Sequence, residues 1–335
     1  MTAPLRNARV LVYIVDGTLS RLDPGRETHA GALWKLLAGE GPRPDRLVAY
    51  HPGVQGAGAG RWWRAIIGEG VNDAIRAGYG FLSSRWRPGD RILLFGYSRG
   101  AYAVRSLAGM IGRVGLLNPE AALDRRVRRA FRHYESWPSR AGRIFSRAHC
   151  RTDVEIEMIG VWDTVRSLGL PYPLLSRLHP AATEFHDHAL GPQVRAGYHA
   201  LAVDEDRTAF NPVMWRCEPG WHGRLEQLWF PGGHGDVGGE VGDFAPARPL
   251  ANVALVWMLE RAAHHGLPLP VDWRDRFPVD ASAPMCGTRR GIGRGFLFRR
   301  PRRVGASDGE DLHPAVAARM QSVQGYVPRA QGLEV

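Results

Sequence analysis

The chain has 335 residues, of which 44% are hydrophobic and 23% charged, ordinary values for a globular protein with a large buried core. Its N-terminal apolar run, Val10–Val15, is too short for a secretory signal peptide, and no run approaches the ~20 apolar residues that span a bilayer. These features exclude a classical secretory or membrane-spanning protein and predict a cytoplasmic one, unless a secretion system that needs no signal peptide exports it.

The charged residues and the cysteines narrow the range of partners and cofactors. The formal net charge is +11, with Lys35 as the only lysine, and this balance favours contact with anionic surfaces. The three cysteines, Cys150, Cys217 and Cys286, are too widely spaced for a disulfide framework or a metal-binding pair. The cysteines thus predict no metal site, and the chemistry inferred below requires neither a metal nor an organic cofactor.

Short apolar runs bounded by Gly, Pro or Asp alternate along the chain with longer helical stretches. The predicted strands are Val10–Val15, Leu47–Tyr50, Arg91–Phe95, Val154–Trp162, His199–Val203 and Leu225–Phe230. The predicted helices are Trp62–Trp86, Ala101–Val114, Pro119–Ser136 and Leu250–His265. This alternation predicts an α/β fold with a mostly parallel central sheet flanked by helices. We expect one domain over residues 1–335, with an irregular surface excursion rich in Arg and Gly at about 275–309.

The most informative segment is the sequence GYSRG at 96–100, which lies between a predicted strand and a predicted helix. Gly-x-Ser-x-Gly in this context is typical of a nucleophile elbow, a tight turn that exposes the serine hydroxyl. Gly96 and Gly100 remove the Cβ atoms that would collide in such a turn. The start of the helix places backbone N–H groups beside the serine oxygen, where negative charge develops during catalysis. Ser98 is therefore the predicted nucleophile.

A serine nucleophile needs a base, and the base needs an acid to orient it. In α/β hydrolases the acid follows the serine in the chain and the histidine comes last. Asp163 ends a strongly apolar predicted strand, so it is expected at the same sheet edge as Ser98. Capping of a following helix is the alternative role for Asp163. Asp236 is the alternative acid, although it lies only two residues from the predicted base.

The predicted base is His234, which follows a strand in the glycine-rich sequence PGGHGDVGG at 231–239. Such a loop can bring an imidazole ring to the serine without steric conflict, and its position fits the order of the triad. His313 is the alternative base, because it also follows both partners. His199 lies inside a predicted strand and is interpreted as a buried histidine of the core or of the surroundings of the site.

The oxyanion of an acyl-transfer reaction needs backbone donors from two places. The amide of Arg99, directly after the serine, is one candidate. The amides of Gly17 and Thr18 are the other candidates, because they follow the first predicted strand. Asp16 in the same turn is expected to brace the loop by hydrogen bonds from its side chain to the backbone.

These motifs together resemble a known family. The segments VDGT at 15–18, GYSRGAY at 96–102, VWDTV at 161–165 and WFPGGHGDVGG at 229–239 are similar to the α/β-hydrolase catalytic domain of the type VI secretion phospholipase effectors. Segments 199–205 and 313–316 extend the resemblance, which covers the chain from about residue 10 to about residue 330. The resemblance implies a lipid hydrolase with a Ser–Asp–His triad at Ser98, Asp163 and His234.

Two arginine-rich stretches bear on the substrate. The stretch at 125–132 lies on a predicted helix and is interpreted as a solvated charged face. The stretch at 289–303 mixes arginines with the apolar sequence Phe-Leu-Phe at 296–298, and fits a solvated face and a lipid contact equally well. We expect peripheral contact with an anionic membrane, and we do not expect nucleic acid to be a partner.

The sequence thus predicts a serine hydrolase that cleaves carboxylic esters of lipids, phospholipids or other small molecules. One alternative is an acyltransferase or thioesterase that uses the same triad. The other is a basic membrane- or nucleic-acid-binding protein with an inactive hydrolase core.

Overall fold

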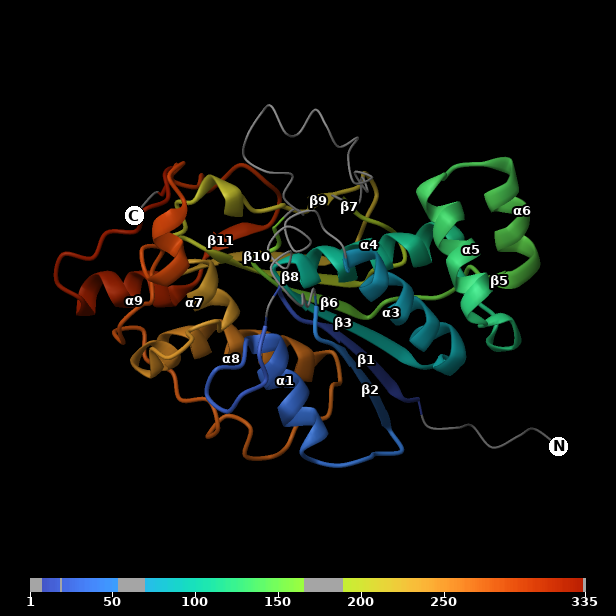
Figure 1. Cartoon of the computed structure of the whole chain (residues 1–335), viewed down its shortest axis with the longest axis horizontal. Coiled ribbons are helices and arrows are strands. Elements are labelled where there is room, and N and C mark those ends of the chain that lie inside the picture. Colours follow the sequence, from blue (N-terminus) through green and yellow to red (C-terminus); the bar gives the residue numbers. More distant parts are fainter. Residues whose placement is uncertain (1–7, 19, 54–69, 166–188, 334–335) are drawn as a thin grey trace.

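A seven-stranded sheet forms the centre of the computed structural model, which describes residues 8–18, 20–53, 70–165 and 189–333 (Figure 1). In sheet order the strands are β11 (Glu310–Leu312), β10 (Arg224–Phe230), β8 (Ala196–Ala202), β6 (Met158–Trp162), β3 (Arg91–Tyr97), β1 (Val10–Val15) and β2 (Arg46–His51). Every pair of neighbours is parallel. The prediction of a mostly parallel central sheet flanked by helices is confirmed.

Helices cover both faces of the sheet (Figure 1). One layer contains α3 (Val71–Arg85), α4 (Arg99–Val114), α5 (Asp124–Glu135) and α6 (Arg140–His149). The other contains α1 (His29–Ala38) and α8 (Arg248–His264). The short helix α7 (His234–Gly238) and the helix α9 (Pro314–Ser322) lie on the side of β10 and β11. The remaining strands form two small pairs, β4 (Leu116–Leu117) with β5 (Cys150–Arg151) and β7 (Ala189–Leu190) with β9 (Arg216–Cys217).

The strands are apolar along their whole length because each face of the sheet meets a helical layer. All six residues of β1 are buried. Leu11 and Tyr13 belong to the core cluster that includes α3 and α4, whereas Val12 and Ile14 belong to the cluster that includes α1 and α8. Because helices cover both faces, the loops lie at the two edges where the strands begin and end. In α/β proteins ligand sites form at the edge where the strands end, their carboxyl ends.

The structure differs from the predicted elements mainly at their ends. The predicted strand at 154–162 pairs in the sheet only from Met158, because residue 156 makes an isolated bridge to Val194 instead. The predicted helix at 119–136 is a 3₁₀ turn, Pro119–Ala121, followed by α5. The predicted helix at 62–86 appears as α3 from Val71, and its first part, 62–69, lies outside the described residues.

No helix within the described ranges combines the length and the apolar character that crossing a membrane requires.

Candidate active site

Three loops at the carboxyl edge of the sheet bring together the residues singled out in the sequence. Ser98 follows β3, Asp163 follows β6, and His234 begins α7 shortly after β10. Strands β3 and β6 are neighbours, and β8 alone separates β6 from β10. Residues 136 positions apart in the chain therefore come within hydrogen-bond distance.

Ser98 lies in a strained turn between β3 and α4. Its φ is 56° and its ψ is −117°, a conformation that L-residues seldom adopt. The turn is held from the sheet, because the Ser98 amide donates a 3.0 Å hydrogen bond to the carbonyl of Trp162. The flanking glycines are needed for close approach: a Cβ at Gly96 would lie 2.5 Å from the Gly100 carbonyl oxygen, and a Cβ at Gly100 2.3 Å from the Val15 carbonyl oxygen.

His234 forms hydrogen bonds to both of its predicted partners. Its Nε2 lies 2.9 Å from Ser98 Oγ, and its Nδ1 lies 2.6 Å from Asp163 Oδ2. An ionised carboxylate accepts hydrogen bonds only, so Nδ1 donates to Asp163 and Nε2 is left to accept from the serine hydroxyl. All three side chains are buried. The rings of Tyr97 and Phe210, 4.9 and 4.8 Å from the imidazole, hold its orientation.

Asp163 also has a partner that the sequence analysis did not identify. Arg302 binds both carboxylate oxygens, with Nη1 2.6 Å from Oδ1 and Nη2 2.9 Å from Oδ2. The amide of Ala202 donates a third bond of 3.1 Å. Burial alone would raise the pKa of the Asp163 carboxyl, but Arg302 and His234 outweigh it and hold that pKa well below its usual range. Asp163 is therefore an anion at neutral pH.

The position of Arg302 corrects the interpretation of the arginine-rich stretch at 289–303. The sequence predicts a surface excursion there, but Arg302 is only 4% exposed. Its guanidinium also donates to the carbonyls of Ala202 and Phe210. Arg299 is likewise drawn inward, to Asp206 at 2.6 Å. Two arginines of this stretch, Arg299 and Arg302, thus form ion pairs with buried carboxylates.

Asp236, the alternative acid, has a different set of partners. Its carboxylate accepts hydrogen bonds from the amides of Gly233, Cys286 and Gly287, at 2.7 to 3.0 Å. These bonds close the first turn of α7 and tie it to the loop at 286–287. Burial raises the pKa of the Asp236 carboxyl. The carboxylate that forms a hydrogen bond with the His234 imidazole is that of Asp163 and not that of Asp236.

Two other histidines have roles within the fold. His313, the alternative base, caps α9 by accepting from the Ala315 amide, and its ring stacks on Phe230 at 4.4 Å. Burial lowers the pKa of His313 to about 4. His199, on β8, accepts a 3.1 Å bond from the Thr164 amide and so supports the turn that carries the acid.

The turn after β1 contains Gly17 and Thr18, the candidate oxyanion donors outside α4. The Gly17 amide donates 2.7 Å to Asp16 Oδ1, so this candidate donor already has an acceptor. Asp16 is fully buried and also accepts from the hydroxyls of Thr28 and Tyr50, each at 2.6 Å. Burial raises the pKa of the Asp16 carboxyl. Asp16 thus braces the turn, as expected, and its oxygens are engaged by its own surroundings.

Thr18 and Arg99 are the two remaining candidate donors. The Thr18 hydroxyl is buried and has no hydrogen-bond partner among the described residues. The Arg99 amide is the first in α4, and first-turn amides have no acceptor within their helix.

Within the described part of the chain, no group of three or more His, Cys, Asp or Glu side chains is arranged to hold a metal ion.

The chain is similar in sequence to known proteins. The model of the family described as "T6SS, Phospholipase effector Tle1-like, catalytic domain" matches residues 9–261. An uncharacterized protein of Saccharomyces cerevisiae is 28% identical over 236 residues, which are 62% of this chain and 33% of the yeast protein. The chain therefore spans about a third of the length of that curated relative.

Two solved structures are similar at 17% identity. An uncharacterized protein from Pseudomonas aeruginosa superposes with a TM-score of 0.51 and covers 82% of this chain and 49% of that one. The Tle1 effector bound to the VgrG spike of the type 6 secretion system gives a TM-score of 0.38 over 72% of this chain and 54% of that one.

The segment matched by the family model contains Ser98, Asp163 and His234 and ends before Arg302. It covers well over half of the chain, and it confirms the resemblance seen in the motifs. The protein belongs to the Tle1-like family of type VI secretion phospholipase effectors, through the catalytic domain of that family.

Proposed function

We propose that this protein is a serine hydrolase that cleaves carboxylic esters of lipids, with phospholipids as its principal substrates. The observation that carries the proposal is the continuous hydrogen-bonded chain from Ser98 through His234 to Asp163. Membership in a phospholipase family supports a lipid ester as the substrate. Membership in an effector family supports export by a type VI secretion system.

In the proposed mechanism Ser98 Oγ attacks the ester carbonyl carbon while His234 Nε2 takes the hydroxyl proton. The carbonyl oxygen becomes an oxyanion, to which the Arg99 amide and the Thr18 amide and hydroxyl donate. His234 then gives the proton to the leaving alcohol oxygen, and an acyl-serine remains. Water, deprotonated by His234, attacks this acyl group, and His234 returns the proton to Ser98 Oγ as the carboxylic acid leaves.

Asp163 and Arg302 keep the base in the correct state. Asp163 holds the Nδ1–H tautomer and stabilises the imidazolium that forms when His234 takes the proton. Arg302 fixes the carboxylate plane by its bidentate contact and so sets the direction of the Asp163–His234 bond. The ion pair also compensates the cost of burying a carboxylate that is 0% exposed.

Release of fatty acid from phospholipid measures this activity directly. Purified protein is incubated with phosphatidylglycerol in mixed micelles, and free fatty acid and lysophospholipid are quantified. We expect Ser98→Ala to lower the rate by about 10⁴-fold or more, because the nucleophile is lost. The matched control is Ser106→Ala, which removes a buried serine hydroxyl in the helix that follows Ser98, α4. This variant is expected to retain activity.

A Ser98→Ala rate close to that of the wild type would contradict the assignment of the nucleophile. Transfer of the acyl group to an added alcohol in preference to water would instead indicate an acyltransferase with the same triad.

A further inference from the structure

We propose that an exposed apolar pair, Leu297 and Phe298, together with the arginines around it, seats the active-site side of the protein on the surface of an anionic lipid bilayer. We call Leu297 and Phe298 the apolar lip. This inference rests on the proposed function, because it explains how the catalytic domain would reach esters in a membrane.

Both side chains of the apolar lip are exposed. Leu297 is 82% and Phe298 58% exposed. Among the large hydrophobic side chains that are exposed in the described part of the chain, these are the only two that are adjacent in sequence. Adjacent exposed apolar side chains with a polar border mark interaction surfaces.

The lip is held firmly and lies next to the site. The carbonyl of Phe298 accepts hydrogen bonds from both the amide and the hydroxyl of Thr208, each 3.1 Å long. On the inner side, Phe296 packs on Phe210 with ring centroids 5.3 Å apart, and Phe210 packs on His234 at 4.8 Å. The lip therefore begins one residue beyond the aromatic wall that contacts the proposed base.

The surroundings of the lip are strongly positive. Residues 281–307 contain seven arginines and no acidic residue. Arg299 and Arg302 are used by Asp206 and Asp163. The other five are exposed, and we call them the arginine rim: Arg289, Arg290, Arg294, Arg300 and Arg303. Exposed apolar side chains bordered by cations are what interfacial proteins use to insert into an anionic membrane surface.

The combination of features favours a bilayer over other occupants. A nucleic-acid duplex would attract the rim, but its phosphate backbone offers no apolar surface to Leu297 and Phe298. A second copy of the chain would cover the lip only by bringing two arginine rims together, which like-charge repulsion opposes. An anionic bilayer supplies both a negative surface and an apolar layer beneath it.

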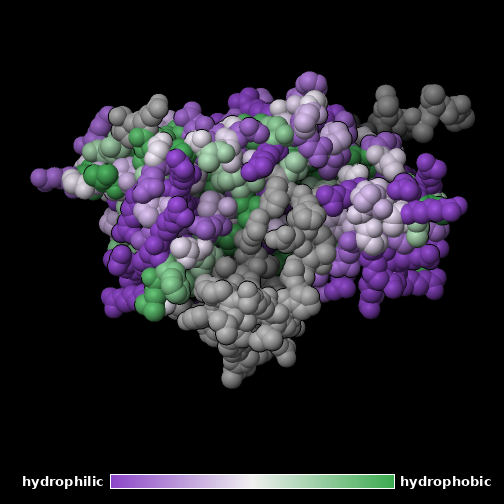
Figure 2. Space-filling view, turned by 90° about the horizontal axis from the view of Figure 1, so that it is seen from above, coloured by the Kyte–Doolittle hydropathy of each residue, from purple (hydrophilic) through white to green (hydrophobic). Residues whose placement is uncertain are grey.

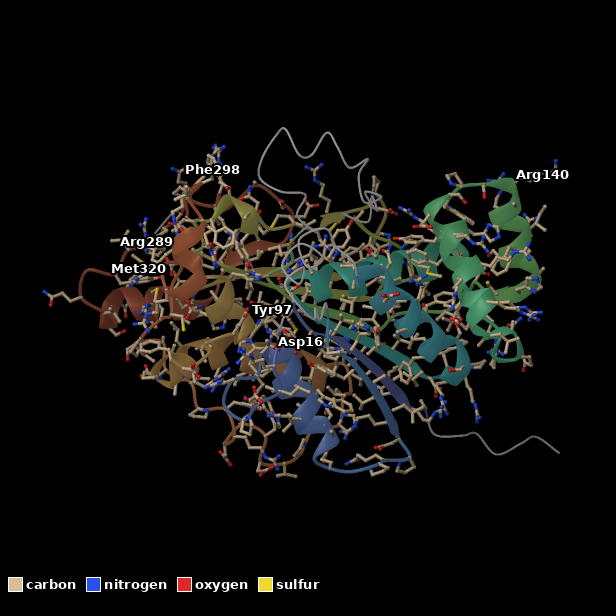
Figure 3. The ribbon with its side chains drawn as sticks, viewed as in Figure 1. Asp16, Tyr97, Arg140, Arg289, Phe298 and Met320 are labelled. Atoms are coloured by element: carbon tan, nitrogen blue, oxygen red, sulfur yellow. The ribbon has the colours of Figure 1, made fainter. Side chains whose placement is uncertain are left out.

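A second basic surface, on α5 and α6, lies far from the candidate active site. Helices α5 and α6, residues 124–149, carry eight arginines and two acidic residues. Tyr134 of α5 packs under Arg113 in the last turn of α4, a 16-residue helix that extends about 24 Å from Ser98. Figure 3 shows Phe298 and Arg289 at one end of the molecule and Arg140 at the other. Figure 2 looks onto the side where Phe298 lies, with hydrophobic patches set between strongly hydrophilic ones.

Flotation with lipid vesicles tests the proposal without relying on turnover. All proteins carry Ser98→Ala, and the vesicles are either phosphatidylcholine alone or an equimolar mixture with phosphatidylglycerol. We expect binding to the mixed vesicles only. Leu297→Ser with Phe298→Ser should weaken it at least 10-fold, and Arg294→Gln with Arg300→Gln at least 3-fold. The matched control, Arg125→Gln with Arg132→Gln on α5, removes the same charge and should leave binding unchanged.

The controls distinguish a seat on the bilayer from misfolding, from self-association and from a general attraction of positive charge to anionic lipid. Thermal unfolding and light scattering are measured on each variant, since exposed substitutions are expected to leave the fold unchanged. The proposal is overturned if Ser98→Ala protein with the apolar lip intact does not bind mixed vesicles. It is also overturned if the α5 control weakens binding as much as the rim variant does, or if light scattering shows a dimer that the substitutions at Leu297 and Phe298 dissociate. Hydrolysis of a soluble short-chain ester by protein with Ser98 intact reports on the proposed function separately.

Discussion

Ser98 and Asp163 share a backbone feature that sets them apart from the rest of the described chain. With φ values of 56° and 42°, they are the two non-glycine residues there that have positive φ. Such conformations cost energy and persist only where the surrounding structure imposes them, which is common at functional sites. The backbone thus marks the proposed nucleophile and the proposed acid independently of their hydrogen bonds.

His199 is expected to make the protein less stable in acid. Burial lowers the pKa of His199 to about 3 from an ordinary value of 6.5. Between these values the unfolded chain binds a proton and the folded protein does not, so the free energy of unfolding falls as the pH falls below 6.5. The uptake of one proton changes the slope of the free energy of unfolding against pH by at most about 1.4 kcal/mol per pH unit.

We predict that His199→Gln flattens this loss between pH 6 and pH 4, as measured by urea unfolding at several pH values. His264→Gln, at an exposed position on α8, is the control and should leave the slope as in the wild type. An unchanged slope in His199→Gln would show that other groups cause the loss of stability in acid.

At the level of elements, the strands and the elbow were predictable because their signals are local. β1 has the predicted limits, and β2, β3 and β10 lie within two residues of theirs. A parallel strand is an apolar run that any window of sequence reveals. Helices α1 and α6 were not predicted. Gly31 and Lys35 interrupt the apolar pattern of α1, and Gly142 and three arginines interrupt that of α6, so packing against the core is what stabilises both helices.

The parts of the site that could not be predicted depend on contacts between distant elements. Arg302 lies 139 residues from Asp163 in a stretch without regular structure, and no spacing rule links the two. The engagement of the Gly17 amide by Asp16 was equally hidden, because it depends on the conformation of one turn. By contrast, the order of Ser98, Asp163 and His234 follows the sequence rule for α/β hydrolases, so the sequence suggested all three.

The segment that carries Arg302 is expected to stabilise the fold through its ion pair. Arg302→Met leaves the Asp163 carboxylate buried without its cation, and we predict a loss of about 3–5 kcal/mol in the free energy of unfolding, measured in urea at pH 7. Arg303→Met, the exposed neighbour, should cost little. Arg302→Lys retains the charge without the planar fork and should fall between the two. Equal stability of the Arg302→Met and Arg303→Met variants would refute the role given to this ion pair.

For the whole molecule, the sheet order explains why the site forms where it does. Strands β3 and β6 lie side by side at the centre of the sheet, with core clusters on both faces. Each of the two strands is therefore held by a neighbouring strand on either side and by packed helices on both faces, which suits a site that must fix three side chains. Residues beyond the matched segment 9–261 complete this centre by returning Arg302 to it.

The charge of the molecule is divided between two ends. The α5–α6 pair carries a net charge of +6, from eight arginines and two acidic residues, out of +11 for the chain. Arg289, one residue of the arginine rim, lies toward the other end, as does Phe298 of the apolar lip (Figure 3). Only the second group is associated with the apolar lip, and this difference in position underlies the vesicle experiment.

The central claim is that Ser98 is a nucleophile activated by His234. The most direct measurement is labelling of the purified protein with a fluorophosphonate probe, followed by mass spectrometry of the modified peptide. We predict one modification, at Ser98, which His234→Ala slows at least 100-fold and His313→Ala does not slow. A folded protein that is not labelled, or labelling that depends on His313 and not on His234, would contradict the claim.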